Sequence, residues 1–482
     1  MVKLEKMPPQ TLDSSAVSRS EGDAFEIRQR KLILATAITS NLLGNLGLIG
    51  INVALPSIQR EMGLGAVQMA WISLSTMLVM AMFSAPIARL SDLVGRRKVT
   101  IFGLWFTILA SLGCALAKSF WVLILFRAMT GFGLVSFFTT ITTMVTVAYP
   151  AQERGRVLGL TISSVYIGLS LGPILTGFMV EIWGWPSIFW FTVIGMLPPM
   201  VLIYMVKADS PPTPNETLNK TGTFLWLTAV ALGFIGLASL GQTFAVPLLA
   251  GGLLLGVLFV YKSKHSGNPV LDMRLFLDSR RFTFSCLAAL ISYLSSTSVS
   301  FLLSQYLQYS RGLSPSHAGL FLIAQPVVQA ALTPLSGRLS DRYDAGKLAS
   351  AGMTVIMGAI LIFATNLGAD TSSVLLIMTM SMAGAGFAFF SAPNTNAIMS
   401  AVSRVRLGQA SGVITVTRLF GQIASIALIT IVFNLVIGPG MITEDKYPSF
   451  ITASRICFFI FAPLCLTGIL ASLARGRAKK VA

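Results

Sequence analysis

The chain reads A-R-L-S-D-L-V-G-R-R-K from Ala88 to Lys98, a short charged connector between two long apolar runs. A second version, G-R-L-S-D-R-Y-D-A-G-K, runs from Gly337 to Lys347. The shared Arg-Leu-Ser-Asp and the closing Lys recur at a constant offset, since 338 − 89 and 347 − 98 both equal 249. Two copies of one connector indicate two copies of the structural unit that carries it.

The composition of the 482 residues excludes a soluble globular protein. Hydrophobic residues make up 54% of the chain and charged residues only 11%, with a mean hydropathy of +0.77, whereas about a quarter of the residues in soluble domains are charged. A helix needs about 20 apolar residues to cross the hydrocarbon core of a bilayer. The apolar runs have about that length and do not alternate with period two, so they predict membrane-spanning helices and not barrel strands.

We predict an all-α polytopic membrane protein with fourteen transmembrane helices. The apolar runs lie at 32–55, 69–88, 99–117, 120–147, 157–180, 187–206, 223–240, 245–261, 282–303, 317–336, 348–366, 373–392, 408–436 and 451–473.

Positive charge alternates between the connecting segments. With the N-terminus in the cytoplasm, 28 of the 35 Lys and Arg residues fall in cytoplasmic segments, five on the opposite side, and two within spans. This asymmetry follows the positive-inside rule and predicts a multi-pass protein of the cell (inner or plasma) membrane with both termini cytoplasmic. It also explains the net charge of +17 without a nucleic-acid partner.

Glycines repeat with the connectors. Gly131 and Gly133 match Gly384 and Gly386 at an offset of 253, and Gly155, Gly159 and Gly168 match Gly408, Gly412 and Gly421 at the same offset. We therefore predict two equivalent six-helix halves, at 32–206 and 282–473. Cytoplasmic tails at 1–31 and 474–482 flank them, and linkers with two inserted helices occupy 207–281. Internal repeats of this kind build many secondary transporters, which hold substrate near the midplane between the halves.

The span at 157–180 carries a dense pattern of small residues with one proline: Gly159, Gly168, Gly172, Pro173 and Gly177. Small residues let helices approach closely in lipid, and a proline frees a carbonyl and permits a bend. The pattern predicts a packed interface that can act as a pivot.

These features together resemble the major facilitator superfamily, in its fourteen-helix drug:proton antiporter branch (multidrug efflux type). The resemblance covers nearly the whole chain and includes N-V-A-L-P at 52–56, L-F-R-A-M-T-G-F-G at 125–133 and N-P-V-L-D-M-R-L-F at 268–276. The glycine pattern of the span at 157–180 is similar to that branch's antiporter motif.

The resemblance implies that the first connector is a conformational gate. A carboxylate there can also cap a helix N-terminus or pair with a neighbouring Arg on physical grounds alone. By resemblance, Asp92 latches the halves together in the outward-facing state, with the start of the span at 408–436, near 404–408, as its receptor. We expect the second copy of the connector to have a mainly structural role, and we expect Asp92→Asn to impair transport more than Asp341→Asn. The candidate gate residues are Arg89, Asp92, Gly95, Arg96, Arg97 and Asp341.

Candidates for proton coupling or substrate contact are polar residues inside the spans. A buried charge is costly in lipid, so Arg127 and Arg418 are functional candidates, with snorkelling or carbonyl binding as the alternative. The family usually places an Asp in the first span at the position of Gly47 here, so coupling through that carboxylate is not expected. The remaining candidates are Glu181, Asn41, Asn45, Asn52, Gln305, Gln325 and Asn394.

The expected function is secondary-active export of small amphiphilic compounds by alternating access, as multidrug efflux in antiport with protons. A cavity with two arginines and no acid favours anionic, zwitterionic or neutral solutes. The alternative is a dedicated exporter of an anionic metabolite or siderophore-like solute, and a third hypothesis is a membrane sensor or scaffold without transport. No phosphate-binding loop or metal-ligand spacing is present in the sequence, so neither an enzyme, a cofactor nor a metal is expected, and we expect a monomer.

Overall fold

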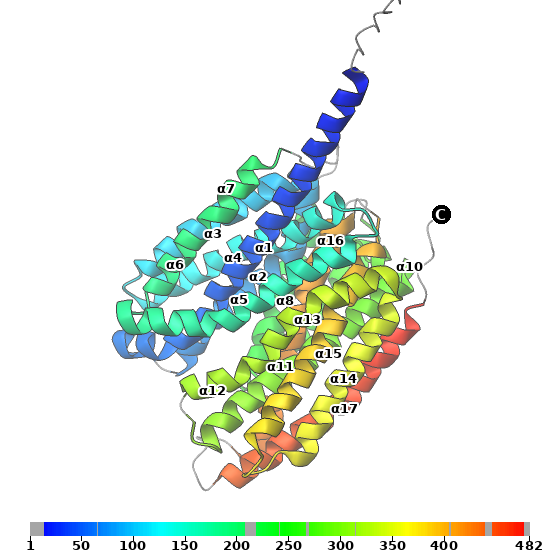
Figure 1. Ribbon diagram of the computed structural model, residues 1–482. Helices are drawn as coiled ribbons and strands as arrows, with labels where there is room; N and C mark the ends of the chain where they lie inside the picture. The colour runs from blue at the N-terminus through cyan, green and yellow to red at the C-terminus, as the bar shows by residue number, and fades with distance from the viewer. Residues whose placement is uncertain are drawn as a thin grey trace, which may run out of the picture.

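The structure, a computed structural model, describes residues 14–64, 66–207, 218–240, 242–266, 269–313, 315–403, 406–438 and 446–476. The regular elements within these segments are helices (Figure 1). The N-terminal part contains α1 (Ser14–Met62), α2 (Ala66–Val94), α3 (Arg96–Ala115), α4 (Phe120–Ala148), α5 (Arg154–Trp183), α6 (Ser187–Gly195) and α7 (Leu197–Met205). The insertion contains α8 (Lys220–Ala238), α9 (Ala245–Lys264) and α10 (Arg274–Asp278). The C-terminal part contains α11 (Arg280–Tyr309), α12 (Pro315–Leu322), α13 (Ala324–Arg342), α14 (Ala345–Asn366), α15 (Ser373–Ser400), α16 (Leu407–Val436) and α17 (Tyr447–Ala474).

These helices confirm the predicted all-α membrane architecture. Thirteen segments of the described chain are long and apolar enough to cross a membrane, and α1 contains the first apolar run, at 32–55. The α6–α7 pair and the α12–α13 pair each count as one such segment. Counted in this way, and apart from the five-residue α10, the described helices correspond one for one to the fourteen runs in the sequence.

Some helix boundaries differ from the sequence-based ones for local reasons. Residues 14–31, placed in a polar tail by the sequence, belong to α1, so the first helix begins before its apolar run. The sixth span breaks at Met196, just before Pro198 and Pro199, and the tenth breaks at Ile323, just before Pro326. Proline lacks the N–H that an uninterrupted helix requires, which explains both interruptions.

The two halves repeat one another at the level of individual contacts. A Cβ added to Gly131 of α4 would lie 2.4 Å from the Thr76 carbonyl oxygen of α2. A Cβ added to Gly384 of α15 would lie 2.4 Å from the Gln325 carbonyl oxygen of α13. Each half therefore uses an equivalent glycine to bring an equivalent pair of helices into backbone contact. Small residues allow helices to associate closely in lipid in this way.

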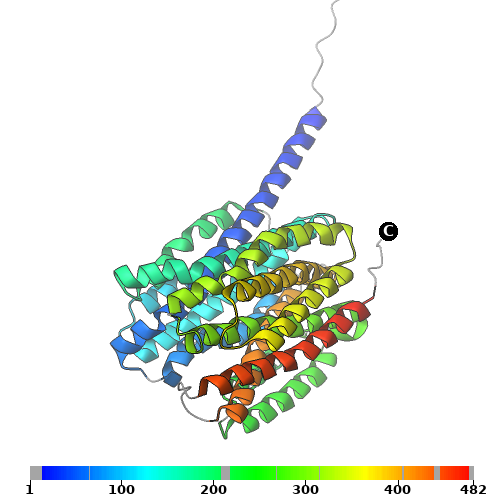
Figure 2. The ribbon, with the colours of Figure 1, turned by 60° about the horizontal axis from the view of Figure 1, so that its bottom comes forward.

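The inserted helices α8 and α9 lie at the edge of the bundle, where Figure 2 draws them in green. Only 22% and 17% of their apolar windows are buried, less than in most of the other spans. The Trp226 indole N–H of α8 donates to the Met82 carbonyl oxygen of α2 at 2.8 Å. The insertion therefore packs on the outside of a complete two-half bundle.

Both described chain ends lie at the same end of the bundle as the two charged connectors (Figure 1). We call this the connector end.

We predict that Gly384→Ala lowers the thermal stability of the purified protein in detergent, because the new methyl group meets a backbone oxygen. Overpacking of this kind costs about 1–3 kcal/mol. Gly131→Ala should behave in the same way, as its counterpart in the other half. Gly319→Ala on α12 is the matched control, since its Cβ would meet nothing within 4 Å. Equal melting temperatures for all three variants and the unmodified protein would contradict the proposed close contact.

Candidate functional site

A cavity of about 480 Å³ lies between the two halves. Helices α1, α2, α4 and α5 line it from the N-terminal half, and α11, α13, α15 and α16 line it from the C-terminal half. Its polar lining residues are Asn41, Asn45, Thr142, Thr161, Tyr166, Tyr293, Ser296, Thr297, Ser300, Gln325, Gln329, Ser391, Thr395, Ser411, Thr415, Arg418 and Gln422.

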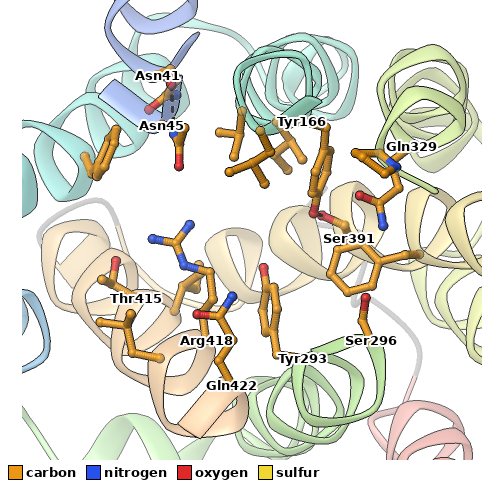
Figure 3. A pocket seen from close by; sticks show the side chains of 18 of the residues that line it. Asn41, Asn45, Tyr166, Tyr293, Ser296, Gln329, Ser391, Thr415, Arg418 and Gln422 are labelled. Atoms are coloured by element: carbon orange, nitrogen blue, oxygen red, sulfur yellow. Dashed lines mark hydrogen bonds between the residues drawn. The ribbon is translucent and has the colours of Figure 1, made fainter. Parts of the chain in front are cut away.

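Arg418 is the charged residue among those that line this cavity, and no carboxylate occurs among them. Its side chain extends from α16 into the space between the halves, on the side that faces Asn45 of α1 (Figure 3). A half-buried guanidinium in a cavity without a lining carboxylate favours an anionic group on a ligand, because such a group satisfies its N–H donors and its charge together.

Aromatic rings form the wall beside Arg418. The Phe387 ring lies edge-on to Tyr166 and to Tyr293, with centroids 5.8 Å and 5.4 Å apart. The Tyr166 hydroxyl lies 3.4 Å from the Ser391 Oγ, which joins α5 to α15 across the two halves. This wall offers apolar ring faces and edges next to a cation, a combination suited to an amphiphile.

Three of the predicted amides line the cavity. The Asn45 side-chain amide donates to the Asn41 carbonyl oxygen at 2.8 Å, which fixes its orientation along α1. The Gln325 amide nitrogen donates to Ser296 Oγ at 3.1 Å, and its oxygen accepts from Ser300 Oγ at 3.2 Å. Gln329 and Gln422 also line the cavity, although neither was among the predicted site residues. Their positions on faces of α13 and α16 depend on tertiary packing, which the sequence pattern did not reveal.

Other predicted residues lie elsewhere. Arg127 is buried inside the N-terminal half, where its Nε donates to the Ile72 carbonyl oxygen at 3.0 Å. Asn394 accepts from Arg475 Nη1 at 3.0 Å and donates to the Ser285 carbonyl oxygen, in a network within the C-terminal half. Exposed Glu181 of α5 and half-buried Gln305 of α11 are outside the cavity lining. The Asn52 side chain lies outside the described part of the structure.

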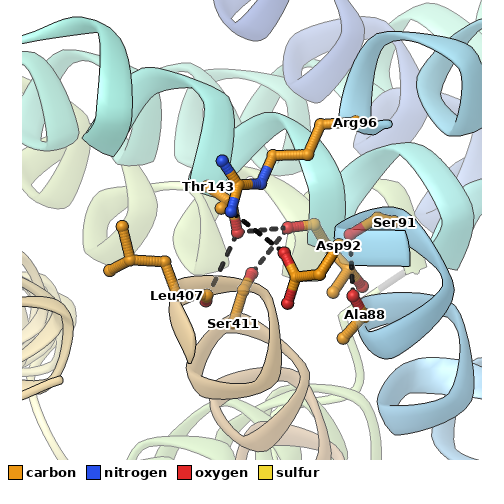
Figure 4. A network of polar contacts seen from close by, with 8 residues as sticks. Ala88, Ser91, Asp92, Arg96, Thr143, Leu407 and Ser411 are labelled. Carbon is orange, nitrogen blue, oxygen red and sulfur yellow. Dashed lines mark hydrogen bonds and ion pairs between the residues drawn. The ribbon is translucent and has the colours of Figure 1, made fainter. Parts of the chain in front are cut away.

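The first connector brings Asp92 against the start of α16 (Figure 4). Its carboxylate is 2% exposed and pairs with Arg96, with Nη2 and Oδ1 3.0 Å apart. A Cβ added to Gly408 would lie 2.5 Å from Asp92 Oδ2, so only glycine allows this approach. The partial positive charge of the α16 N-terminus then stabilises the carboxylate. Thus Asp92 joins the two halves at the connector end.

Two polar contacts reinforce the same junction. Ser411 Oγ of α16 donates to the Thr139 carbonyl oxygen at 2.7 Å, and Thr143 Oγ1 lies 3.4 Å from the Leu407 carbonyl oxygen (Figure 4). Both link α4 of one half to α16 of the other. The residues 404 and 405, part of the predicted receptor, lie outside the described residues.

Two other gate candidates of the first connector, Gly95 and Arg97, serve its own half. Gly95 has a φ of +113° in the turn between α2 and α3, a backbone conformation that favours glycine. Arg97 donates to the Ile203 and Tyr204 carbonyl oxygens at 3.3 and 3.2 Å, near the end of α7. Arg89 is buried, with 5% of its surface exposed.

The second connector makes a contact of the same kind. The Asp341 carboxylate accepts from the backbone N–H groups of Gly155 and Arg156, at 2.7 and 2.9 Å, at the start of α5. Carboxylates at a helix N-terminus accept otherwise unsatisfied N–H groups and interact favourably with the helix dipole. This contact differs from the mainly structural role expected of the second connector, because each of the two connectors contacts a helix of the other half. The expected ranking of the two Asp→Asn variants in transport stays a prediction.

A sequence profile of the Major Facilitator Superfamily matches residues 37–273 and 285–481. The chain belongs to the major facilitator superfamily. Multidrug resistance protein Stp of Mycobacterium tuberculosis is 31% identical over 392 residues, which cover 79% of this chain and 71% of Stp. Riboflavin transporter RibZ of Clostridioides difficile is 26% identical and covers 92% of this chain and 97% of RibZ.

The human organic anion transporter MFSD10 shares the fold, with a TM-score of 0.67 at 14% identity, over 93% of this chain and 99% of MFSD10. Relatives such as Stp place this superfamily member in the drug-efflux branch. No group of three or more His, Cys, Asp or Glu able to hold a metal ion occurs among the described residues of the superfamily fold.

The glycine pattern of α5 serves two different interfaces in this superfamily member. A Cβ added to Gly168 would lie 2.4 Å from the Leu42 carbonyl oxygen, and one at Gly172 3.3 Å from that of Leu46, both on α1. A Cβ added to Gly159 would lie 2.9 Å from the Thr333 carbonyl oxygen of α13, in the other half. Helix α5 therefore packs against α1 of its own half and α13 of the opposite half through glycines on opposite faces. The Pro173 side chain is outside the description, and Gly177 is half-buried.

Gly47 occupies the place where the superfamily branch was expected to carry an Asp. A Cβ there would lie 2.5 Å from Thr192 Oγ1 of α6. In this chain the position faces Thr192 of α6, whose side chain would have to shift to admit a larger residue.

We predict that Asp341→Ala opens the connector end. Each charge-assisted hydrogen bond contributes about 1.5–3 kcal/mol, so losing them favours the opposite conformation about tenfold or more. The measurement is the rate at which a hydrophilic maleimide labels Thr143→Cys, a position buried between α4 and α16. The native cysteines Cys114, Cys286, Cys457 and Cys465 are buried and give a low background.

Asp344→Ala is the matched control for that experiment. Asp344 caps α14 within its own half, where it accepts from Gly346 and Lys347 N–H groups. It should leave the labelling rate unchanged, whereas Asp92→Ala should raise it as Asp341→Ala does. If the Asp341→Ala variant is labelled no faster than the Asp344→Ala control, the Asp341 carboxylate does not link the two halves.

Proposed function

We propose that this protein exports small amphiphilic compounds, neutral or anionic, by alternating access between its two halves in antiport with protons. The observation that carries the proposal is the cavity between the halves, where Arg418 stands beside an aromatic wall without a carboxylate among the described lining residues. A cationic drug would find no counter-ion there, and Arg418 would repel it.

Alternating access requires contacts that close one end of the cavity at a time. The hydrogen bonds that Asp341 accepts from Gly155 and Arg156, and the contact of Asp92 with Gly408, lie at the connector end. Such contacts suit a conformation closed at the connector end and open at the other. The excess of Lys and Arg in the segments at this end favours a cytoplasmic location for it, in the cell membrane. The conformation would then be outward-facing and ready to release solute.

The proposal includes coupling to protons, but it assigns no residue as the proton carrier. The cavity lining offers no acid among the described residues, and Gly47, which faces Thr192 of α6, supplies no carboxylate. Asp92 and Asp341 are the carboxylates that join the halves, so their protonation would weaken the closure of the connector end. We therefore propose them as the groups through which pH acts on the cycle, with the transporter working as a monomer.

A dedicated exporter of an anionic metabolite is the second candidate, and Arg418 favours it specifically. One guanidinium in a polar and aromatic cavity can recognise a single carboxylate or phosphate on a defined solute. The two candidates differ in breadth of substrate and not in mechanism. Comparing several structurally unrelated anions in the transport experiment below distinguishes them, because a dedicated exporter would accept one of them at most.

We predict that inverted membrane vesicles with an acidic interior accumulate carboxyfluorescein, an anionic aromatic amphiphile, faster than they accumulate the cation ethidium. Arg418→Ala should lower the anion uptake about 10- to 100-fold, because a charge-assisted hydrogen bond contributes about 1.5–3 kcal/mol. Arg418→Lys should retain part of the activity, since it keeps the charge but loses the planar fork.

Expression and melting temperature must be unchanged in both variants for this comparison. Uptake that does not respond to collapse of the pH gradient would remove proton antiport from the proposal. Equal anion uptake in Arg418→Ala and unmodified vesicles would remove Arg418 from the binding site.

A further inference from the structure

A second hollow lies on the outside of the bundle, between the inserted helices and α16. It has a volume of about 780 Å³ and is separate from the central cavity in its lining. Helices α8, α9 and α16 and the segment around α10 supply its lining, which includes Trp226, Leu249, Val260, Met273, Val416 and Phe420. We call it the insertion groove.

The insertion groove is an apolar channel at membrane depth. Its lining along α9 extends from Leu249 to Val260, about 17 Å at 1.5 Å per residue, within a span of the membrane. Leu253 and Val257 are 73% and 59% exposed. A Cβ added to Gly256 would meet nothing within 4 Å. The protein thus leaves this space unfilled, on a surface that faces hydrocarbon.

Basic residues flank the insertion groove at the connector end. Lys262 and Lys264 stand in the last turn of α9, just beyond Val260, and both are exposed. Exposed Arg274 follows the lining residue Met273. The nearby Asp272 is engaged by Arg406, with Nη2 and Oδ2 3.0 Å apart. An apolar channel that ends beneath several cations matches the two parts of an anionic lipid, since each Lys or Arg near a membrane surface attracts such lipids by about 1 kcal/mol.

We infer that the insertion groove binds one acyl chain of an anionic phospholipid from the leaflet at the connector end. The phosphate of this lipid lies beside Lys262, Lys264 and Arg274, and its chain follows α9 between Val260 and Leu249. This site is independent of the identity of the exported solute.

The bound lipid contacts α16, the same helix that lines the central cavity. At 100° per residue, Val413, Val416 and Phe420 share one face of this helix, and Thr415 and Arg418 share the opposite face. The first face lines the insertion groove and the second lines the central cavity. Because α16 also begins at the Asp92 contact, a lipid in the groove packs against the helix on which both sites depend.

The test uses phosphatidylglycerol with a photoactivatable diazirine in its acyl chain, added to the full-length protein in phosphatidylcholine nanodiscs. Illumination and peptide mass spectrometry should place the label on α8, α9 and α16. Gly256→Trp places an indole in the groove from a position where a Cβ meets nothing within 4 Å, and it should lower this labelling at least fivefold. The matched control is Leu258→Trp, on the same helix, exposed and outside the groove lining, which should leave it unchanged.

A competition with the unmodified protein makes the result independent of any variant's folding. Unlabelled phosphatidylglycerol should reduce the labelling at lower concentration than the same amount of added phosphatidylcholine, and Lys262→Ala combined with Arg274→Ala should abolish this difference. Lys118→Ala, at the opposite end of the bundle, is the control for loss of charge. Equal competition by the two lipids, equal labelling in Gly256→Trp and Leu258→Trp, or cross-links from α9 to a second copy of the chain would each overturn the proposal.

Discussion

The arrangement of the two halves depends on carboxylates placed against helix N-termini. Asp341 accepts two backbone N–H groups at the start of α5, and Asp92 lies against Gly408 at the start of α16. A helix N-terminus has unsatisfied N–H groups and a partial positive charge, so each half supplies an acid and each half supplies a receptor. The contact between the carboxylate and the helix N-terminus is strong while water is excluded, and it weakens when the carboxylate is hydrated or protonated. That property makes it suitable for a junction that must open and close.

The central cavity follows from the same two-fold arrangement. Joining the halves at the connector end leaves space between α1, α2, α4 and α5 on one side and α11, α13, α15 and α16 on the other. Helix α16 is important at three levels, because its start meets Asp92, one face carries Arg418 into the cavity, and the other face lines the insertion groove. A change in the position of this helix would therefore affect the gate, the binding of the transported solute and the contact with the surrounding lipid.

Much of the fold could be predicted from the sequence, whereas the composition of the site could not. Apolar runs, charge alternation and the repeated connector led to the fourteen spans and the superfamily, and the glycine pattern led to the close contacts of α5. Of the polar candidates, Arg418, Asn41, Asn45 and Gln325 line the cavity, and their roles stay predictions. The sequence did not distinguish these cavity-lining candidates from Arg127 and Asn394, which are equally polar and equally within spans, because only packing decides which helix face meets the other half. The contact of Asp341 was underestimated for a related reason: its partners are backbone N–H groups, which leave no signature in the side-chain sequence.

The central claim is that the two carboxylate contacts hold the connector end closed while the opposite end is open. The most direct measurement is of spin-label distances by double electron–electron resonance, with one pair at Lys98 and Lys347 and another at Lys118 and Asp370. All four positions are exposed, and the first two occupy equivalent places in the repeat. We predict that the combined change Asp92→Ala and Asp341→Ala lengthens the first distance and shortens the second. Distances that stay unchanged, or that lengthen at both ends together, would contradict it.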